Sequence, residues 1–211
     1  MKIALVGATG KIGRQIAQLA MARGHSVVAL IREGAHIPEE LRDIPRAIIT
    51  LDNPRSIVPA IQKFNVLASA YGPDATSADI LPEVTQTLIA AARQAHIRRL
   101  IVVGGAGSLE VAPGMQLIDT PDFPEAYKPL ARAHREALKI LTIASDLDWT
   151  FFAPASEIGP GEKLGHFRVQ ARHLLTDANG RSVIHYPDYA AAFVDEIEHP
   201  QFIRKVATAA Y

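Results

Sequence analysis

"KIALVGATGKIG", residues 2–13, joins a short apolar run to a turn that contains three glycines. The run at residues 3–6 predicts a buried strand, and the apolar positions after Gly10 recur at the spacing of a helix. Gly7, Gly10 and Gly13 therefore lie on a turn between a strand and a helix, the setting that a dinucleotide-binding turn requires. The stretch predicts the first strand and helix of an α/β fold.

Each glycine of the turn has a separate expected task. Gly7 allows the tight turn, Gly10 lets the backbone approach a pyrophosphate, and Gly13 lets the helix pack closely on the strand. Thr9 stands where the usual G-x-G-x-x-G pattern has its second glycine. Unpaired N–H groups at the helix start, together with the helix dipole, favour phosphate. The residues of this turn that we expect to contact a nucleotide are Gly7, Thr9, Gly10, Lys11, Ile12 and Gly13. A purely structural turn is the alternative.

Strand and helix patterns alternate along the rest of the chain, which is typical of a parallel sheet covered by helices. Strands are expected at residues 2–6, 26–31, 47–51, 66–71, 100–103 and 148–154, with shorter signals at 166–169, 182–184 and 206–209. Helices are expected at residues 11–23, 80–96, 126–145 and 187–200, with a short one beginning at Asn53-Pro54. Asp188 is expected to cap the last helix. The irregular segments 104–125 and 155–163 are typical of lids or binding loops.

Composition narrows the classes of partner and chemistry. Lys and Arg number 22 and Asp and Glu 22, so the formal net charge is zero and nothing favours nucleic acid or a membrane surface. The absence of cysteine excludes thiolate and Cys-based metal chemistry, so redox work would need a cofactor. The histidines lack metal-site spacing, and we expect no metal.

No apolar stretch approaches the ~20 residues that span a bilayer. We expect one cytoplasmic domain over residues 1–211, monomeric or homodimeric, acting on a small molecule.

The tip of the second strand decides which dinucleotide is preferred. Arg32 occupies this tip and favours the 2′-phosphate of NADP, whereas Glu33 keeps NAD possible. A solvated arginine at a strand end is the alternative reading of Arg32. Asp52, just after the third strand, is a candidate acceptor for the adenine amino group, or else it shares a helix cap with Asn53.

Two further strand ends supply candidate cofactor contacts. Ala70, Tyr71 and Gly72 follow the fourth strand and reach the carboxyl edge, where ligands bind in open α/β sheets. Gly72 would allow the cofactor's ribose to approach the backbone, and a plain turn is the alternative. Gly104 and Gly105, after the fifth strand, similarly suggest backbone that lies against the cofactor.

The chain resembles the atypical short-chain dehydrogenases/reductases of the NmrA-like NAD(P)-binding group, in particular the NADH-flavin reductase subgroup, and more distantly the biliverdin-IXβ and flavin reductases. The motifs that carry this resemblance run in family order over nearly the whole chain: GATGKIG (7–13), VVGGAGSL (102–109), LDWTFFAPA (147–155), PGEKLGHF (160–167) and DYAAAFVDEIEHP (188–200). The resemblance implies a Rossmann-like, doubly wound parallel sheet, a small C-terminal substrate lobe at about residues 155–211, and NAD(P) as cofactor. It also implies that Pro154 and Ala155 flank the nicotinamide carboxamide and that Ser108 lies near the nicotinamide.

The chain departs from ordinary members of this family at their Tyr-x-x-x-Lys pair, in which lysine lowers the tyrosine pKa for proton transfer. Tyr127 is followed four residues later by Ala131, and Lys128 by Arg132, so the pair is missing in either register. Its absence weakens alcohol dehydrogenase, epimerase and dehydratase readings. Hydride transfer to a flavin needs the flavin to stack on the nicotinamide in a pocket that excludes water, and solvent can supply the remaining proton.

Ser108 and Tyr127 remain candidate catalytic residues. Ser108 could donate to a substrate oxygen or only cap its own loop, and Tyr127 could stack on a planar substrate or serve the fold. The sequence thus predicts an NAD(P)H-dependent reductase of a flavin or a quinone-like acceptor. A non-catalytic NAD(P)-binding redox sensor and an epimerase/dehydratase-like enzyme stay open as alternatives.

Overall fold

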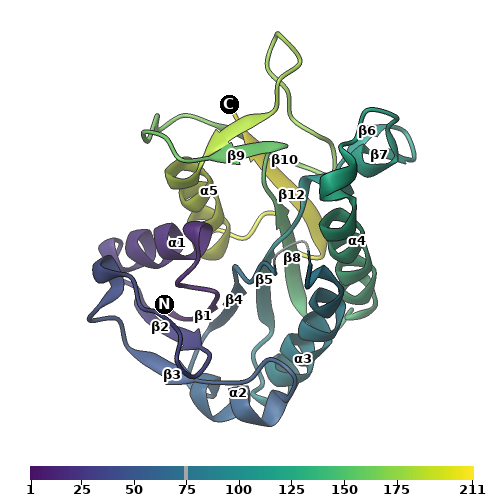
Figure 1. Cartoon of the computed structure of the whole chain (residues 1–211). Coiled ribbons are helices and arrows are strands. Elements are labelled where there is room, and N and C mark those ends of the chain that lie inside the picture. The colour runs from purple at the N-terminus through teal and green to yellow at the C-terminus, as the bar shows by residue number, and fades with distance from the viewer. Residues whose placement is uncertain (74–75) are drawn as a thin grey trace.

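The computed structural model describes residues 1–73 and 76–211. Among these residues an eight-stranded sheet has the order β10-β12-β8-β5-β4-β1-β2-β3 (Figure 1). Its strands are β1 (Lys2–Val6), β2 (Ser26–Ile31), β3 (Arg46–Ile48), β4 (Val66–Ser69), β5 (Arg99–Val103), β8 (Asp148–Ala153), β10 (Arg168–Ala171) and β12 (Lys205–Ala210). The strands from β3 across to β12 run parallel, and β10 pairs antiparallel with β12 at one edge. The strand order reverses at β1, which is the position where such sheets bind ligands.

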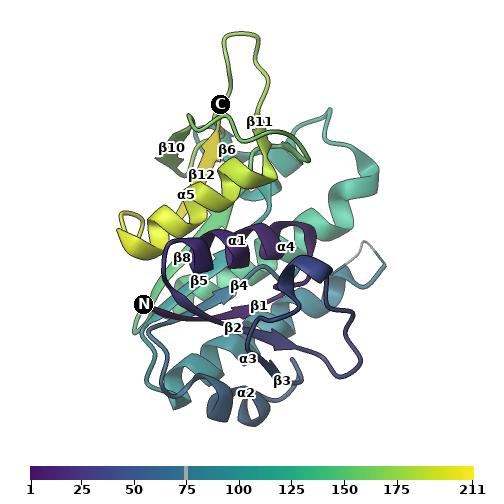
Figure 2. The ribbon, with the colours of Figure 1, turned by 90° about the vertical axis from the view of Figure 1, so that its left-hand side faces the viewer.

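Helices cover both faces of the sheet. One face carries α1 (Lys11–Ala22) and α5 (Tyr186–Glu198), which lie against each other (Figure 2). The other face carries α2 (Pro54–Ile61), α3 (Leu81–Gln94) and α4 (Lys128–Ile143). This arrangement is the Rossmann-like, doubly wound α/β fold predicted from the sequence.

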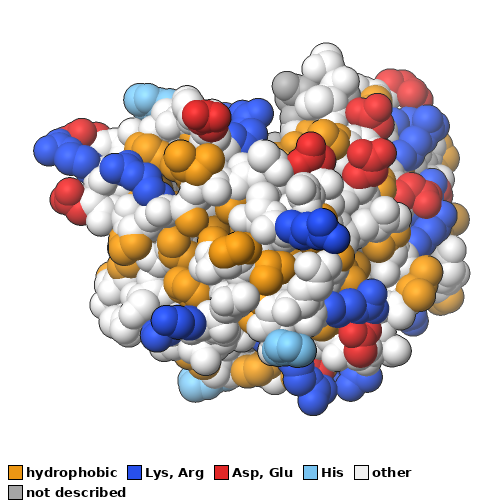
Figure 3. All heavy atoms as spheres, turned by 90° about the horizontal axis from the view of Figure 1, so that it is seen from below, with side chains coloured by type: hydrophobic (Ala, Val, Ile, Leu, Met, Phe, Trp, Pro, Cys, Tyr) orange, Lys and Arg blue, Asp and Glu red, His pale blue; other side chains and the backbone are white. Residues whose placement is uncertain are grey.

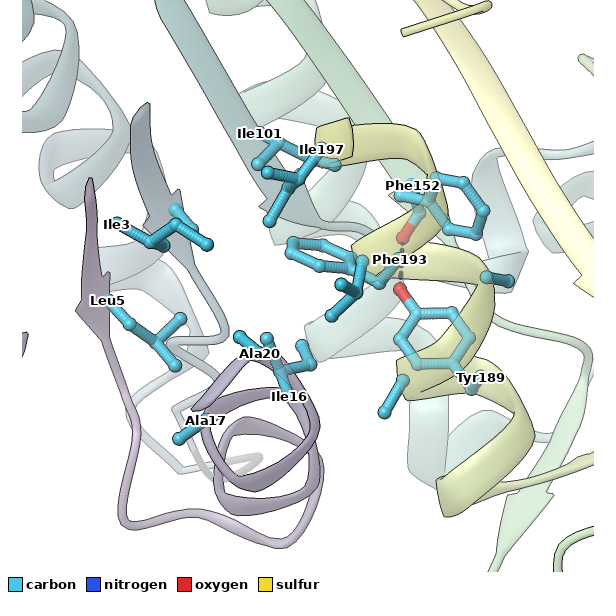
Figure 4. Close-up of a cluster of buried hydrophobic side chains, with 14 of the residues drawn as sticks. Ile3, Leu5, Ile16, Ala17, Ala20, Ile101, Phe152, Tyr189, Phe193 and Ile197 are labelled. Atoms are coloured by element: carbon cyan, nitrogen blue, oxygen red, sulfur yellow. Dashed lines mark hydrogen bonds between the residues drawn. The ribbon is translucent and has the colours of Figure 1, made fainter. Parts of the chain in front are cut away.

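The core between the sheet and the α1–α5 layer is built from aromatic rings of β8 and α5 and aliphatic side chains of α1. Phe152 of β8 packs edge-on against Tyr189 and Phe193 of α5. The Tyr189 hydroxyl donates to the carbonyl oxygen of Phe152 at 2.5 Å (Figure 4). Ile16 and Ala20 of α1 face these rings, and all five residues are buried. This layer ties the C-terminal helix to the first helix of the chain.

The central strands are buried on both faces because each lies between two helical layers. Along β8, Phe152 packs in the α1–α5 layer, whereas Trp149 and Phe151 pack against the other helices. On neighbouring β5, Ile101 and Leu100 divide in the same way. Such two-sided burial explains the nearly continuous apolar runs of these strands, which made them easy to predict.

Short strands occur inside the two segments that were expected to be irregular. A hairpin of β6 (Glu110–Ala112) and β7 (Met115–Gln116) lies in the first segment, and its Glu110 exchanges backbone hydrogen bonds of 2.9 Å with Arg172 and Leu174. In the second, β9 (Glu157–Gly159) pairs parallel with β11 (Val183–His185). These strands are two or three residues long, which is too short for a periodic signal.

Two expected strands are shorter at their carboxyl ends than the sequence pattern suggests. The expected strand at 47–51 is β3, which ends at Ile48, and the one at 66–71 is β4, which ends at Ser69. The N–H of Ile49 still donates to the carbonyl oxygen of Ile31 at 2.8 Å, and that of Ala70 to the carbonyl oxygen of Val6 at 2.9 Å, but both strands end there. The apolar side chains of Ile49, Leu51 and Tyr71 continue the apolar pattern because they line hollows. The predicted strands were therefore too long at these ends.

On the face seen from below in Figure 3, acidic and basic side chains are interspersed toward the right-hand side, and hydrophobic patches lie across the middle. Within the part of the chain that the structure describes, no helix combines the length and the apolar character needed to cross a bilayer.

A buried ion pair fixes the amino-terminal edge of the central strands. Arg99 of β5 contacts Glu196 of α5 through Nη2 and Oε1 at 2.9 Å, and both side chains are nearly inaccessible. Thr150 joins them with hydrogen bonds of 2.7 and 3.0 Å. Glu196 also accepts the backbone N–H groups of Gln201 and Phe202 at 2.9 and 3.1 Å. One carboxylate therefore connects β5, β8, α5 and the turn that leads to β12.

We expect Glu196→Ala to lower the free energy of unfolding by about 3–5 kcal/mol, because it leaves the Arg99 guanidinium buried without its counter-charge. Glu136→Ala removes an exposed ion pair with Lys139 on α4 and should cost about 1 kcal/mol or less. Urea unfolding of both variants measures the difference. Equal losses would show that the buried pair adds nothing beyond an exposed one.

Candidate functional site

The glycine turn is a place where three segments of backbone meet. Gly7 has a φ of +74°, and a Cβ built on it would lie 2.6 Å from the carbonyl carbon and oxygen of Ala70. A Cβ on Gly13 would lie 2.0 Å from the carbonyl oxygen of Gly7. Both positions therefore exclude any side chain, and they hold the start of α1 directly above β1 and beside the end of β4.

A pocket of about 190 Å³ opens beside this turn, along the carboxyl edge of β1, β2 and β4. Its lining residues are Val6, Gly7, Thr9, Gly10, Leu30, Arg32, Ala35, Ile49, Leu51, Ala70, Tyr71 and Gly72. The structure thus brings together Gly7, Thr9, Gly10, Arg32, Ala70, Tyr71 and Gly72 from the residues that the sequence suggested. The lining residues that the sequence did not suggest are Val6, Leu30, Ala35, Ile49 and Leu51, although apolar residues at strand ends near an open edge are a usable signal for a flat ring.

Gly72 differs from the other glycines of this site. Its φ is not in the left-handed region, and a Cβ on it would meet no heavy atom of the described residues within 4 Å, its chain neighbours aside. The fold itself therefore does not require glycine at this position. A ligand that lies against the backbone at Gly72 would explain why this position is glycine.

The charges around the start of α1 favour an anion. The first turn of α1 contains no acidic residue and begins with Lys11, although a cation is unfavourable at this end of the helix dipole. Arg32 is exposed and makes no ion pair with the described residues, and Arg14 pairs with Glu40 at 3.2 Å. Free N–H groups at a helix start, the helix dipole and nearby cations are features that favour phosphate.

The structure separates Asp52 from the helix cap that it was suggested to share. The side chain of Asn53 caps α2 by accepting the N–H of Arg55 at 3.0 Å. Asp52 is exposed and is not among the lining residues, although neighbouring Leu51 is. Its suggested contact with an adenine amino group stays a prediction.

Gly104 and Gly105 follow β5 at the same carboxyl edge, with an aromatic ring behind each. A Cβ on Gly104 would lie 2.2 Å from Cε1 of Phe151, and one on Gly105 would lie 2.8 Å from Cδ2 of His134. The fold alone therefore explains why both positions are glycine. Pro154 and Ala155 come directly after β8, the neighbouring strand, and both are buried.

The two candidate catalytic side chains lie in different surroundings. Ser108 is only 3% exposed, and its Oγ has no hydrogen-bond partner among the described residues. Tyr127 is 64% exposed, directly before α4. The hydrogen bonds and ring contacts of the described residues include none between these two side chains, so their catalytic roles remain predictions.

Asp188 does not cap the last helix as the sequence suggested. That helix, α5, begins at Tyr186, which leaves Asp188 in its first turn. The buried carboxylate accepts the backbone N–H groups of Leu164 and Gly165 at 2.8 and 2.9 Å and the Tyr211 hydroxyl at 2.7 Å. Burial opposes the charge, but these donors outweigh it and hold the pKa of Asp188 below its ordinary value. Asp188 therefore fixes the loop at residues 160–167 to α5.

Comparison with known proteins extends these observations. A family model described as NAD(P)H-binding matches residues 7–200. A "putative exported protein" from Burkholderia pseudomallei is 51% identical, with a TM-score of 0.92 and 100% of each chain covered. A "putative NADH-flavin reductase" from Streptococcus pneumoniae is 32% identical, with a TM-score of 0.84 over 100% of this chain and 99% of that one. A "putative epimerase" from Bacteroides thetaiotaomicron is also 32% identical, with a TM-score of 0.89 over 100% and 96%.

We expect Asp188→Asn to lower the free energy of unfolding by about 2 kcal/mol at pH 7, because an amide cannot accept all three donors. The pKa of Asp188 is lower in the folded protein than in the unfolded chain, so its stabilisation is complete at neutral pH and is lost as the pH falls through the folded-state pKa. Urea unfolding from pH 7 to pH 3 should show the two proteins converging in acid. A constant difference across this range would contradict the role given to the carboxylate.

We expect Gly72→Ala to leave stability within about 0.5 kcal/mol of the parent. The same methyl group should weaken NADPH binding about tenfold or more, since crowding a close contact costs ~1–3 kcal/mol. Gly159→Ala is a matched control, because that glycine also has free space around it and lies outside the pocket. Unchanged NADPH affinity in Gly72→Ala, measured by calorimetry, would place the ligand elsewhere.

Proposed function

The chain belongs to the NAD(P)H-binding family, and on that premise we propose that it is a reductase that transfers a hydride from NADPH to a flavin or a quinone-like acceptor. The fold is that of NAD(P)-binding oxidoreductases. The observation that carries the proposal is the pocket at the glycine turn. Around it lie the start of α1, apolar strand ends and an arginine that makes no ion pair with the described residues.

The residues of the pocket fit the parts of a dinucleotide in order. The N–H groups of Lys11 and Ile12 would bind the pyrophosphate, and Gly10 would let it approach the backbone. Arg32 would pair with a 2′-phosphate, which favours NADPH over NADH. Ile49 and Leu51 would hold the adenine on apolar surface. Gly72, whose lack of a side chain the fold does not explain, would lie along the ribose.

The residues beyond the pocket suggest where the reacting end would lie. Gly104 and Gly105 after β5, and Pro154 and Ala155 after β8, would line the nicotinamide. When bound, NADPH supplies a hydride from C4 of this ring. The chain would then hold the acceptor close to the ring and exclude water from the contact.

A planar redox acceptor suits the side chains at the start of α4. Neither Tyr127 nor Lys128 is followed by lysine four residues later, and Lys128 pairs instead with Glu125. The Ser108 hydroxyl is buried and inaccessible. Reduction of a flavin by a hydride needs one additional proton, and water can deliver it to an exposed edge of the ring. A ketone would need an acid placed against its oxygen, which these side chains do not offer.

The test is an NADPH-oxidation assay with FMN, FAD, riboflavin and quinones. Acceptor-dependent oxidation that exceeds the rate without protein would support the reductase. Tight NADPH binding without turnover of any acceptor would contradict it and favour a redox sensor, which the same lack of a positioned acid would suit.

We expect Arg32→Ala to weaken NADPH binding by about tenfold to a hundredfold, because a charge-assisted hydrogen bond contributes ~1.5–3 kcal/mol. NADH lacks the 2′-phosphate, so its affinity should be unchanged. Arg46→Ala serves as the control, because Arg46 is also exposed but begins the neighbouring strand β3, level with Ala29, and does not line the pocket. Calorimetric titrations with both nucleotides measure the effect, and an equal loss for NADH would refute the assigned contact.

A further inference from the structure

Two aromatic rings from different elements lie directly behind the end of β5. The ring of Phe151, from β8, blocks any side chain at Gly104, and the imidazole of His134, from α4, does the same at Gly105. The two rings meet edge to face, with centroids 6.1 Å apart and an interplanar angle of 81°. The peptide between the glycines therefore rests on a preformed aromatic surface.

Backbone hydrogen bonds fix the two peptides that flank this one. The N–H of Gly104 donates to the carbonyl oxygen of Phe152 at 2.8 Å, and the carbonyl of Gly105 accepts the N–H of Ser108 at 3.1 Å. The Phe152 carbonyl also accepts the Tyr189 hydroxyl. The peptides on either side are therefore held by hydrogen bonds, and the two rings are the packing support of the peptide between Gly104 and Gly105.

His134 acts here through its shape. It is 8% exposed, and burial lowers its pKa to about 4, so the ring is neutral at pH 7. It makes no hydrogen bond to the described residues. It borders a small, mainly apolar hollow, whose lining also includes the polar residues Ser69, Tyr71 and Thr85. A neutral imidazole with apolar neighbours and a glycine in close contact supports the backbone by packing.

We propose that His134 and Phe151 are positioning residues for the nicotinamide half of the cofactor. By fixing the peptide of Gly104 and Gly105 they set how deeply the nicotinamide lies in the site. The inference rests on the proposed function, because it takes this peptide as a wall of the nicotinamide site. The adenosine half is held elsewhere, by Arg32 and the start of α1, so the two halves should respond separately to substitution.

Calorimetry with NADPH and with 2′,5′-ADP, which lacks the nicotinamide, separates the two halves. The variants are Gly105→Ala, which pushes against the imidazole, His134→Leu, which removes the flat ring, and His134→Phe, which retains a ring. We expect Gly105→Ala and His134→Leu to lose about tenfold in NADPH affinity, which corresponds to ~1.4 kcal/mol, with 2′,5′-ADP binding unchanged. His134→Phe should restore most of the NADPH affinity, because it keeps the packing surface without the ring nitrogens.

Two outcomes would overturn the inference while the proposed function stands. One is unchanged NADPH affinity in both Gly105→Ala and His134→Leu, and the other is an equal loss for NADPH and 2′,5′-ADP in folded protein. If Gly105→Ala fails to fold, Phe151→Leu withdraws the other ring and carries the same expectation. The unsubstituted protein tests separately the premise that the nicotinamide binds at this site. If it binds NADPH no more tightly than 2′,5′-ADP, the nicotinamide makes no stabilising contact and both proposals fail.

Discussion

The close contact between the Gly7 carbonyl and Gly13 is the constraint on which the rest of the molecule depends. Because no side chain fits between them, α1 starts immediately above β1, with its free N–H groups at the carboxyl edge of the sheet. The buried face of α1 then meets α5, whose Tyr189 donates to the Phe152 carbonyl. The same carbonyl accepts the N–H of Gly104, so the first turn and the end of β5 belong to one packed unit.

This connection divides the carboxyl edge into two parts with different physical character. Around the glycine turn, the pocket offers backbone N–H groups, an exposed arginine and apolar strand ends, which suit a phosphate-bearing nucleotide. After β5 the edge is a glycine peptide on an aromatic surface, beside the inaccessible hydroxyl of Ser108. The first part would bind the phosphates and the adenosine, and the second would bind the nicotinamide and set the geometry of hydride transfer. Such a division suits chemistry in which the cofactor brings the reactivity and the protein brings placement.

The sequence predicted the parts of this structure whose causes are local. The strand, turn and helix over the first residues, the apolar strands β5 and β8, and Arg32 at a strand tip follow from spacing and residue type. The task of Asp188 could not be predicted, because its partners Leu164, Gly165 and Tyr211 lie 23 or 24 residues away along the chain. The rings behind Gly104 and Gly105 also belong to distant elements, so glycine alone could not distinguish ligand contact from core packing.

A structure of the protein with NADP⁺ bound, at saturating nucleotide, tests the central claim most directly. The account predicts the pyrophosphate on the N–H groups of Lys11 and Ile12, the 2′-phosphate beside Arg32, and the nicotinamide against the peptide of Gly104 and Gly105. A nucleotide bound away from the glycine turn, or no bound nucleotide at all, would contradict it.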